Sequence, residues 1–450
     1  MRWELIHNAG SGNLILIFAG WSTDSSFYSA IEMEGWDIAV VSDYSDFSFP
    51  LERLEGYSTI VLFAWSLGVY AAASVLPFDR ISIAVAINGT EFPAHDSFGI
   101  PETIYDSTAS TLSERNLMKF RRRMSGGAYE TLKDRFGNTP ADIECLRHQL
   151  EFIRQSATDG MTAAVWHRVY ISTDDHIFPP ANQRKAWESH PSSPEIIEIE
   201  APHYVDLQPI VRSVLPSGEK VGERFHKALP TYNSQATAQR KIAEHLTRLC
   251  PTGTQHRVIE IGPGTGLFSR MITGKCNPEI MEYIDLYPTD RFHLAPNEVY
   301  HLEDAEKWMA REAGRNNSSA DAIVSASAIQ WFVNPARFFG NAAKILKPGG
   351  LLLCSTFLPG NLHEIKAVNP HGLIYHGRKE IERMLSLHFK EFTIEEETIT
   401  LDFASPRDAL LHLRQTGVGG ASSSGLPLKD MLAKLPPRLT YRPLYILAYR

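Results

Sequence analysis

The chain has 450 residues, 43% of them hydrophobic, and a formal net charge of −8, so it exceeds the size of one core and two domains are expected. An acidic chain lacks the basic field that binds nucleic acid or anionic lipid, and we expect neither partner. Its 4 scattered cysteines fit neither a zinc site nor a disulfide framework, which favours a metal-free protein in the reducing cytoplasm.

The first half alternates apolar runs with helical patterns. The run NLILIFAG near the start is too short for a signal peptide or a membrane span. Together with DIAVVSDY, STIVLFAW, ISIAVAIN, HRVYIST and EIIEIEA, it predicts buried parallel strands. A polar, helical stretch at about 91–165 predicts an inserted cap. We therefore expect a doubly wound α/β domain over 1–213, followed by a linker at 214–222 that contains proline and glycine.

A serine stands between a strand pattern and a helix pattern in FAWSLGVYAAASVL, residues 63–76. Ser66 lies in Ala-Trp-Ser-Leu-Gly, a variant of the G-x-S-x-G turn that exposes a nucleophilic serine beside backbone N–H groups. The same pentapeptide also fits an ordinary N-cap serine. Two further polar signals follow strands: Asp174 with Asp175 in YISTDDHIFPP, and His203 in EAPHYVDL.

The order Ser, Asp, His is that of the α/β-hydrolase fold, in which the histidine accepts the serine proton and the carboxylate orients the histidine. We favour Asp175 over Asp174, because its D-x-I-x-P spacing resembles the acid loop of that fold, and Asp174 stays open. Solvated turns are the alternative interpretation of these acids and the histidine. The oxyanion hole is expected at the backbone N–H groups of Trp21 and Leu67.

The second half restarts a strand series after the helical segment SQATAQRKIAEHLTRL. The runs RVIEIGPG, IMEYIDLY, AIVSASAI and GLLLCSTF predict a second doubly wound sheet over 223–450. The segments FTIEEETITLDF and RPLYILAYR have no helix pattern between them that would make them parallel, so an antiparallel edge is expected there.

The glycine loop in VIEIGPGTGLFSRM reads G-x-G-x-G, with leucine where a third glycine of the dinucleotide type would stand. This spacing favours S-adenosylmethionine, and KILKPGGLLLCSTF has the helix-loop-strand form of class I (Rossmann-like) methyltransferases. A non-catalytic Rossmann-like domain is the alternative. An acid after the next strand can accept both ribose hydroxyls, and a later acid with its neighbour can meet the adenine edge. The expected cofactor residues are Glu260, Gly262, Gly264, Gly266, Asp285, Asp304 and Ala305.

Residues 223–450 resemble the malonyl-acyl-carrier-protein O-methyltransferase family of biotin synthesis. The resemblance rests on RFHKALPTYNSQATAQRKIAEHL, with Tyr232, Ala236 and Gln239, and on IVSASAIQWF with Trp331. Residues 1–213 resemble the pimeloyl-acyl-carrier-protein methyl ester esterases of the same pathway, in the form that contains FAGW, WSLG and APHY. The resemblance implies a fusion that methylates the malonyl carboxylate and later hydrolyses the pimeloyl methyl ester.

The resemblance also implies an acidic acyl carrier protein as partner. The basic run KFRRRM in the predicted cap, with Arg121, Arg122 and Arg123, is the candidate docking site, and a solvated helix face is the alternative. Substrate contacts are expected from Tyr232, Gln239 and Trp331, of which the two aromatic residues could instead belong to the core. Other substrates on the same two folds, or a non-catalytic carrier-binding first half, stay open, as does the oligomeric state.

Overall fold

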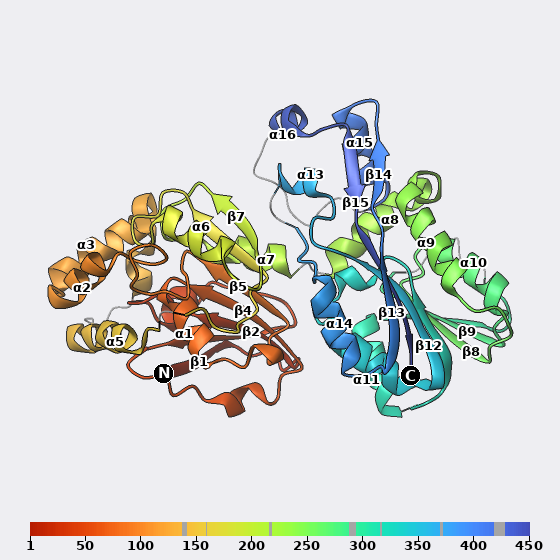
Figure 1. Ribbon diagram of the computed structural model, residues 1–450, viewed down its shortest axis with the longest axis horizontal. Helices are drawn as coiled ribbons and strands as arrows, with labels where there is room; N and C mark the ends of the chain where they lie inside the picture. Colours follow the sequence, from red (N-terminus) through yellow and green to blue (C-terminus); the bar gives the residue numbers. More distant parts are fainter. Residues whose placement is uncertain are drawn as a thin grey trace. The chain divides into compact units, whose positions relative to one another are not determined.

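Figure 1 shows a computed structural model of the chain. The described residues divide into two compact units, Met1–Ile210 and Val211–Arg450, and each contains helices and a seven-stranded sheet. The prediction of two α/β domains is confirmed. No helix in the described part of the chain is long and apolar enough to cross a membrane. The structure describes residues 1–136, 142–158, 160–215, 218–287, 294–315, 317–369, 372–417 and 428–450.

The sheet of the first unit has the order β1-β3-β2-β4-β5-β6-β7. All neighbouring strands are parallel except β1 and β3, which are antiparallel. The central strands are buried along almost their whole lengths, as their continuous apolar sequences predict. The strands are β1 Arg2–His7, β2 Asn13–Phe18, β3 Asp37–Ser42, β4 Thr59–Trp65, β5 Ile83–Ile87, β6 Arg168–Ser172 and β7 Glu195–Ile199.

The edge strand β1 was absent from the predicted series. Its sequence, RWELIH, mixes charged and apolar residues, and none of its residues is fully buried. A strand that pairs on one side only does not need a continuous apolar run, so it lacks the pattern by which the other strands were found.

Helices α2–α5 occupy the stretch between β5 and β6 where the cap was predicted, and Figure 1 shows α2, α3 and α5 grouped away from the sheet. Side chains cap two of these helices: Ser113 caps α3 and Asp142 caps α5. The stretch 214–222, predicted as a linker, includes the last residue of α7 and the first residues of α8. The first-unit helices are α1 Leu67–Val75, α2 Glu102–Ser110, α3 Glu114–Ser125, α4 Tyr129–Leu132, α5 Ile143–Ser156, α6 Pro180–Glu188 and, at the boundary, α7 Leu207–Val214.

The sheet of the second unit has the order β10-β9-β8-β11-β12-β16-β13. The predicted antiparallel edge is confirmed, because β16 pairs antiparallel with both β12 and β13. The expectation that no helix lies between the two segments was wrong, because α15 (Pro406–Gln415) and α16 (Leu428–Lys434) lie there. The last part of FTIEEETITLDF does not join this sheet. It forms β14, which pairs with β15 in a separate two-stranded sheet. The strands are β8 Arg257–Ile261, β9 Ile280–Asp285, β10 Glu298–Leu302, β11 Ala320–Ser325, β12 Leu346–Phe357, β13 Glu391–Glu396, β14 Ile399–Asp402, β15 Arg438–Tyr441 and β16 Pro443–Tyr449.

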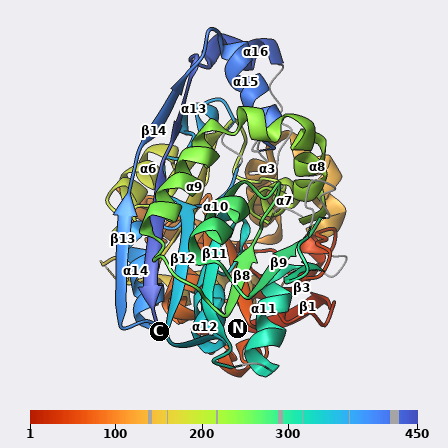
Figure 2. The ribbon, with the colours of Figure 1, turned by 90° about the vertical axis from the view of Figure 1, so that its right-hand side faces the viewer.

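Helices cover both faces of this sheet (Figure 2). Successive residues of a strand point to opposite faces. Val258 packs with α9 and α10, whereas its neighbour Ile259 packs with α11, α12 and α14. Both faces of β8 are therefore buried, and its carboxyl end carries the glycine loop. The helices are α8 Gly218–Gln235, α9 Thr237–Leu249, α10 Leu267–Cys276, α11 Ala305–Arg315, α12 Pro335–Ile345, α13 His363–Lys366, α14 Arg378–Ser386, α15 Pro406–Gln415 and α16 Leu428–Lys434.

Candidate active sites

The first site begins at the turn between β4 and α1. Ser66 occupies this turn with φ 59° and ψ −129°, a conformation that costs energy for a residue with a side chain. It occupies the N-cap position of α1, but its side chain makes no capping hydrogen bond to the helix. Close backbone approaches hold the turn: a Cβ atom on Gly68 would lie 2.5 Å from the Phe18 carbonyl oxygen, and one on Gly89 would lie 2.2 Å from the Ser66 carbonyl oxygen.

A continuous chain of hydrogen bonds leads away from this serine. His203 Nε2 lies 2.9 Å from Ser66 Oγ, and His203 Nδ1 lies 3.0 and 2.9 Å from the two carboxylate oxygens of Asp175. All three residues are buried. Since a carboxylate only accepts hydrogen bonds, it selects the tautomer with the proton on Nδ1 and leaves Nε2 free to accept the serine proton.

Asp174 and Asp175, the two acids that the sequence left as alternatives, have different surroundings in the structure. Asp175 also accepts hydrogen bonds from the backbone N–H groups of Ile177 and Phe178, at 2.8 and 2.9 Å. Asp174 instead is exposed and lies 3.1 Å from the side chain of His176. Asp175, and not Asp174, is therefore the carboxylate that is hydrogen-bonded to His203.

Asn88, which the sequence analysis missed, fixes the backbone of the histidine. Its side-chain amide donates to the His203 carbonyl oxygen at 2.7 Å and to Ser172 Oγ at 2.7 Å, and it accepts from the Ser172 backbone N–H at 2.7 Å. The indole of Trp65 donates to the same His203 carbonyl at 3.1 Å. No local sequence pattern predicts this contact, because Asn88 and His203 are distant in sequence.

The loop after β2 carries the second expected oxyanion donor. The backbone N–H groups of Trp21 and Leu67 donate to no backbone acceptor among the described residues. The loop is tied to the inserted helices: the Trp21 indole donates to the Leu146 carbonyl at 3.0 Å, and Arg121 Nη2 donates to the Ser22 carbonyl at 3.0 Å. The insertion therefore holds the loop that presents the Trp21 N–H.

The basic run on α3 divides into two kinds of arginine. Arg121 is half-buried, and its guanidinium lies 4.5 Å from the ring centroid of Phe136. Arg122 and Arg123 are exposed. Of the three arginines, these two are the exposed ones, and the Arg122 guanidinium lies 5.1 Å from the ring centroid of Tyr129.

The second site lies at the carboxyl end of β8. Gly262, Gly264 and Gly266 adopt φ values of 67°, 54° and 74°, which only glycine adopts at little cost. The Gly264 N–H donates to Asp285 Oδ2 at 3.1 Å, which joins the loop to the end of β9. A Cβ atom on Gly264 would meet nothing within 4 Å, so this side of the loop is open to a ligand.

Two acids, Glu260 and the partly buried Asp285, lie at this loop. Glu260 is buried, and its Oε2 has no hydrogen-bond partner in the described part of the chain. Burial raises the pKa of Glu260 to about 8, and the nearby charges of Asp285 and Glu298 act in the same direction. Burial also raises the pKa of Asp285. Groups of this kind are satisfied by a ligand that brings hydrogen-bond donors or positive charge.

Asp304 and Ala305 lie at the start of α11. The Glu303 N–H donates to the Asp285 carbonyl at 2.9 Å, which brings this segment to the end of β9. Asp304 Oδ1 accepts from the Lys307 N–H at 3.0 Å and so caps α11. The expected cofactor residues thus share one edge of the sheet.

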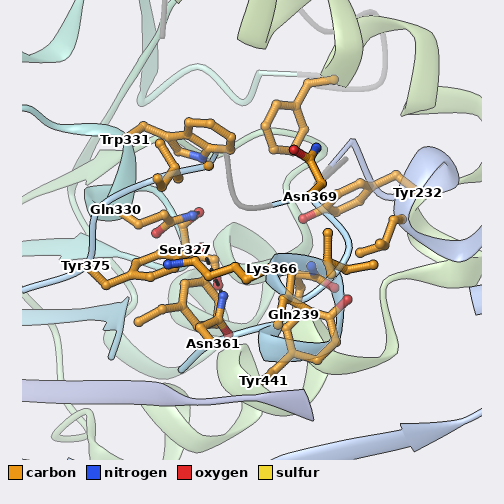
Figure 3. A pocket seen from close by; sticks show the side chains of 17 residues that line it. Tyr232, Gln239, Ser327, Gln330, Trp331, Asn361, Lys366, Asn369, Tyr375 and Tyr441 are labelled. Atoms are coloured by element: carbon orange, nitrogen blue, oxygen red, sulfur yellow. Dashed lines mark hydrogen bonds between the residues drawn. The ribbon is translucent and has the colours of Figure 1, made fainter. Parts of the chain in front are cut away.

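A pocket in the second unit is lined by side chains from several segments (Figure 3). Tyr232, Gln239 and Trp331 line it, as the sequence-based substrate prediction requires. Asn233, beside Tyr232, accepts a hydrogen bond from Thr265 of the glycine loop at 2.6 Å. The sequence analysis missed three other polar or aromatic lining residues from α13 and the segments around it, namely Asn361, Lys366 and Tyr375.

We predict that Glu260 makes the stability of the ligand-free protein depend on pH. Its folded-state pKa lies above the unfolded value, so its contribution to stability is complete below about pH 4 and is lost as the pH rises through about 8. Glu260→Gln removes the titration and keeps the shape. Denaturant unfolding should find this variant more stable than wild type above pH 8 and should find the difference shrinking toward acid.

Glu244→Gln changes an exposed acid on α9 and is the matched control, for which no such trend is expected. A pH-independent difference between Glu260→Gln and wild type would contradict a buried, titrating Glu260.

Comparisons with known proteins match different families to the two units of the chain. Residues 1–209 match the family described as "Pimeloyl-ACP methyl esterase BioG", and residues 233–389 match a "Methyltransferase domain" family. The crystal structure of BioG from Haemophilus influenzae is 31% identical and covers 46% of this chain and 94% of its own, with a TM-score of 0.42.

Relatives named malonyl-[acyl-carrier protein] O-methyltransferase match over different lengths. The protein of Porphyromonas gingivalis is 34% identical over 248 residues, 51% of this chain and 95% of its own. The protein of Bacteroides fragilis is 33% identical over 460 residues, which covers 96% of this chain and 92% of the relative. The chain therefore belongs to the malonyl-[acyl-carrier protein] O-methyltransferase family and is an enzyme that combines an esterase domain with a methyltransferase domain.

Proposed function

We propose that this enzyme makes a methyl ester in its second half and hydrolyses one in its first half. Residues 223–450 methylate the free carboxylate of malonyl-acyl carrier protein with S-adenosylmethionine. Residues 1–213 form an α/β-hydrolase domain with a helical cap, joined through 214–222, and hydrolyse pimeloyl-acyl-carrier-protein methyl ester. One observation carries the esterase assignment: the hydrogen-bonded chain from Ser66 through His203 to Asp175.

The esterase reaction proceeds in two steps. Ser66 Oγ attacks the ester carbonyl while His203 Nε2 takes its proton, and the N–H groups of Trp21 and Leu67 receive the developing oxyanion. Collapse expels methanol, whose oxygen takes the proton from His203, and leaves the acyl group on Ser66. Water, activated by the same histidine, then releases the acid and restores the serine. Asp175 stabilises the imidazolium in both steps.

The residues at the glycine loop fit the proposed cofactor. The open face of Gly264 admits a ligand close to the backbone. Glu260 Oε2, which has no partner in the described part of the chain, can accept a hydrogen bond from such a ligand. In this proposal Gly262, Gly264 and Gly266 bind the amino acid end, Asp285 the ribose hydroxyls, and Asp304 with Ala305 the adenine edge. Bound S-adenosylmethionine supplies an electrophilic methyl group.

The protein's part in methylation is alignment and exclusion of water. A carboxylate is already a nucleophile, so this half needs no general base. Tyr232, Gln239 and Trp331 line the pocket in which the acid lies in our proposal, and several apolar side chains line it with them. A dry pocket removes water from the carboxylate, and a fixed orientation lowers the entropic part of the barrier.

We also propose that the acyl carrier protein docks on α3. Arg122 and Arg123 are exposed there and can meet an acidic partner, whereas Arg121 contacts the Ser22 carbonyl. The proposed docking surface thus includes Arg122 and Arg123 but not Arg121.

Ser66→Ala should abolish ester hydrolysis and leave methylation intact. The loss of the nucleophile lowers the rate by a factor on the order of 1,000 or more. Methanol release from pimeloyl-acyl-carrier-protein methyl ester measures it, and Ser74→Ala on the same helix is the control. Unchanged hydrolysis in Ser66→Ala would exclude the triad, and no hydrolysis by wild type would make the first half a carrier-binding module.

Charge reversal at Arg122 and Arg123 to glutamate should raise the KM for the carrier-bound ester about thirtyfold, because each reversal costs on the order of 1 kcal/mol in docking and the two together cost about 2 kcal/mol. A small soluble methyl ester, which needs no docking, should keep its kcat/KM. Arg53→Glu reverses an exposed charge elsewhere in the first unit and should change neither value. Equal losses with the carrier-bound and the soluble ester would refute the docking site.

A further inference from the structure

The pocket beside the glycine loop gathers hydrogen-bond donors from parts of the chain that are distant in sequence (Figure 3). Tyr232 comes from α8, Ser327 and Trp331 follow β11, and Lys366 ends α13. Figure 3 shows the Lys366 side chain extended among the other lining residues, toward Tyr375. The mainly apolar pocket therefore contains several hydrogen-bond donors from separate segments of the chain.

Two of these donors are buried without an acceptor. Trp331 Nε1 and Ser327 Oγ have no hydrogen-bond partner in the described part of the chain. An indole N–H donates and never accepts, so a ligand that satisfies Trp331 must bring an acceptor. Burial also raises the pKa of Tyr232, whose hydroxyl therefore stays protonated and remains a further donor.

Lys366 gives the pocket its charge. It is the one charged residue among the described lining residues, and its Nζ lies 5.1 Å from the ring centroid of Tyr375. The described lining residues thus include one cation and no carboxylate, and the others are apolar, aromatic, amide or hydroxyl side chains and one glycine. A small anion with several acceptor atoms fits this combination better than a neutral or cationic group.

We propose that Lys366, assisted by the Trp331 N–H, binds the carboxylate that becomes methylated and thereby selects free acids as substrates. This assignment rests on the proposed function of the second half. The pocket adjoins the glycine loop on two sides: Asn233 bonds to Thr265, and a Cβ atom on Gly262 would lie 2.5 Å from the Ala328 Cβ. A carboxylate in the pocket therefore lies beside the loop assigned to the cofactor.

The chemistry predicts which kinetic constant Lys366 controls. One carboxylate oxygen forms a bond to the methyl carbon as the bond from that carbon to sulfur breaks, so the anion and the sulfonium cation become a neutral ester and a neutral thioether. A cation that pairs with the acid therefore stabilises the bound substrate more than the transition state. Lys366 should lower KM without raising kcat, and the ester product should lose the ion pair and leave.

The test compares Lys366→Gln with Lys366→Arg, which keeps the charge, and with Lys379→Gln, which removes an exposed charge from α14. Lys366→Gln should raise the KM for malonyl-acyl carrier protein about tenfold or more, with kcat unchanged or higher than in wild type. Lys366→Arg should recover most of the KM, and Lys379→Gln should behave as wild type. Calorimetry without the acid should give an unchanged Kd for S-adenosylmethionine.

Each other outcome has a separate meaning. An unchanged KM in Lys366→Gln, with normal methylation by wild type, overturns the Lys366 assignment alone. A weakened Kd for S-adenosylmethionine also overturns it, because Lys366 would then bind the carboxylate of the cofactor. Trp331→Phe keeps the ring and removes only the N–H, so it tests the same pocket, by a rise in KM, if Lys366→Gln does not fold. No methylation by wild type refutes the proposed function itself.

Discussion

Both sites depend on one constraint: the backbone must turn sharply from a buried parallel strand into a helix. In the first unit this turn forces Ser66 to φ 59°, and in the second it places glycines with positive φ after β8. The turn packs closely against neighbouring backbone, so a side chain would not fit at Gly68 or Gly89. The turn brings reactive or ligand-binding groups to the carboxyl edge of the sheet, where functional residues from other strands gather.

The two units use this edge for opposite purposes. In the first, the polar side chains satisfy one another, from Ser66 through His203 to Asp175 and on to backbone N–H groups. Such a network holds a proton path ready before substrate arrives. In the second, Glu260 and Trp331 keep buried polar atoms without partners in the described structure. These groups need ligands, which suits a site that contributes positioning and takes its reactive methyl group from a cofactor.

Much of this arrangement could be predicted from the sequence, because it depends on local signals. Buried strands, the serine turn, the glycine loop and the acids after strands all have short patterns. Lys366 has none, since it ends a four-residue helix and reaches the pocket only through the tertiary fold. Asn88 supports His203 from a distant strand end. A run of charged residues in the sequence does not show which of them are exposed. Arg122 and Arg123 are exposed, whereas Arg121 is half-buried and donates a hydrogen bond to the Ser22 carbonyl.

In our proposal, one chain forms a methyl ester at one site and hydrolyses a methyl ester at another. The most direct measurement is the intact mass of malonyl-acyl carrier protein after incubation with S-adenosylmethionine and the Ser66→Ala protein, which preserves any ester formed. The account predicts a gain of one methyl group. No gain, with S-adenosylmethionine binding demonstrated by calorimetry, would contradict the malonyl assignment and favour a methyltransferase of other substrates.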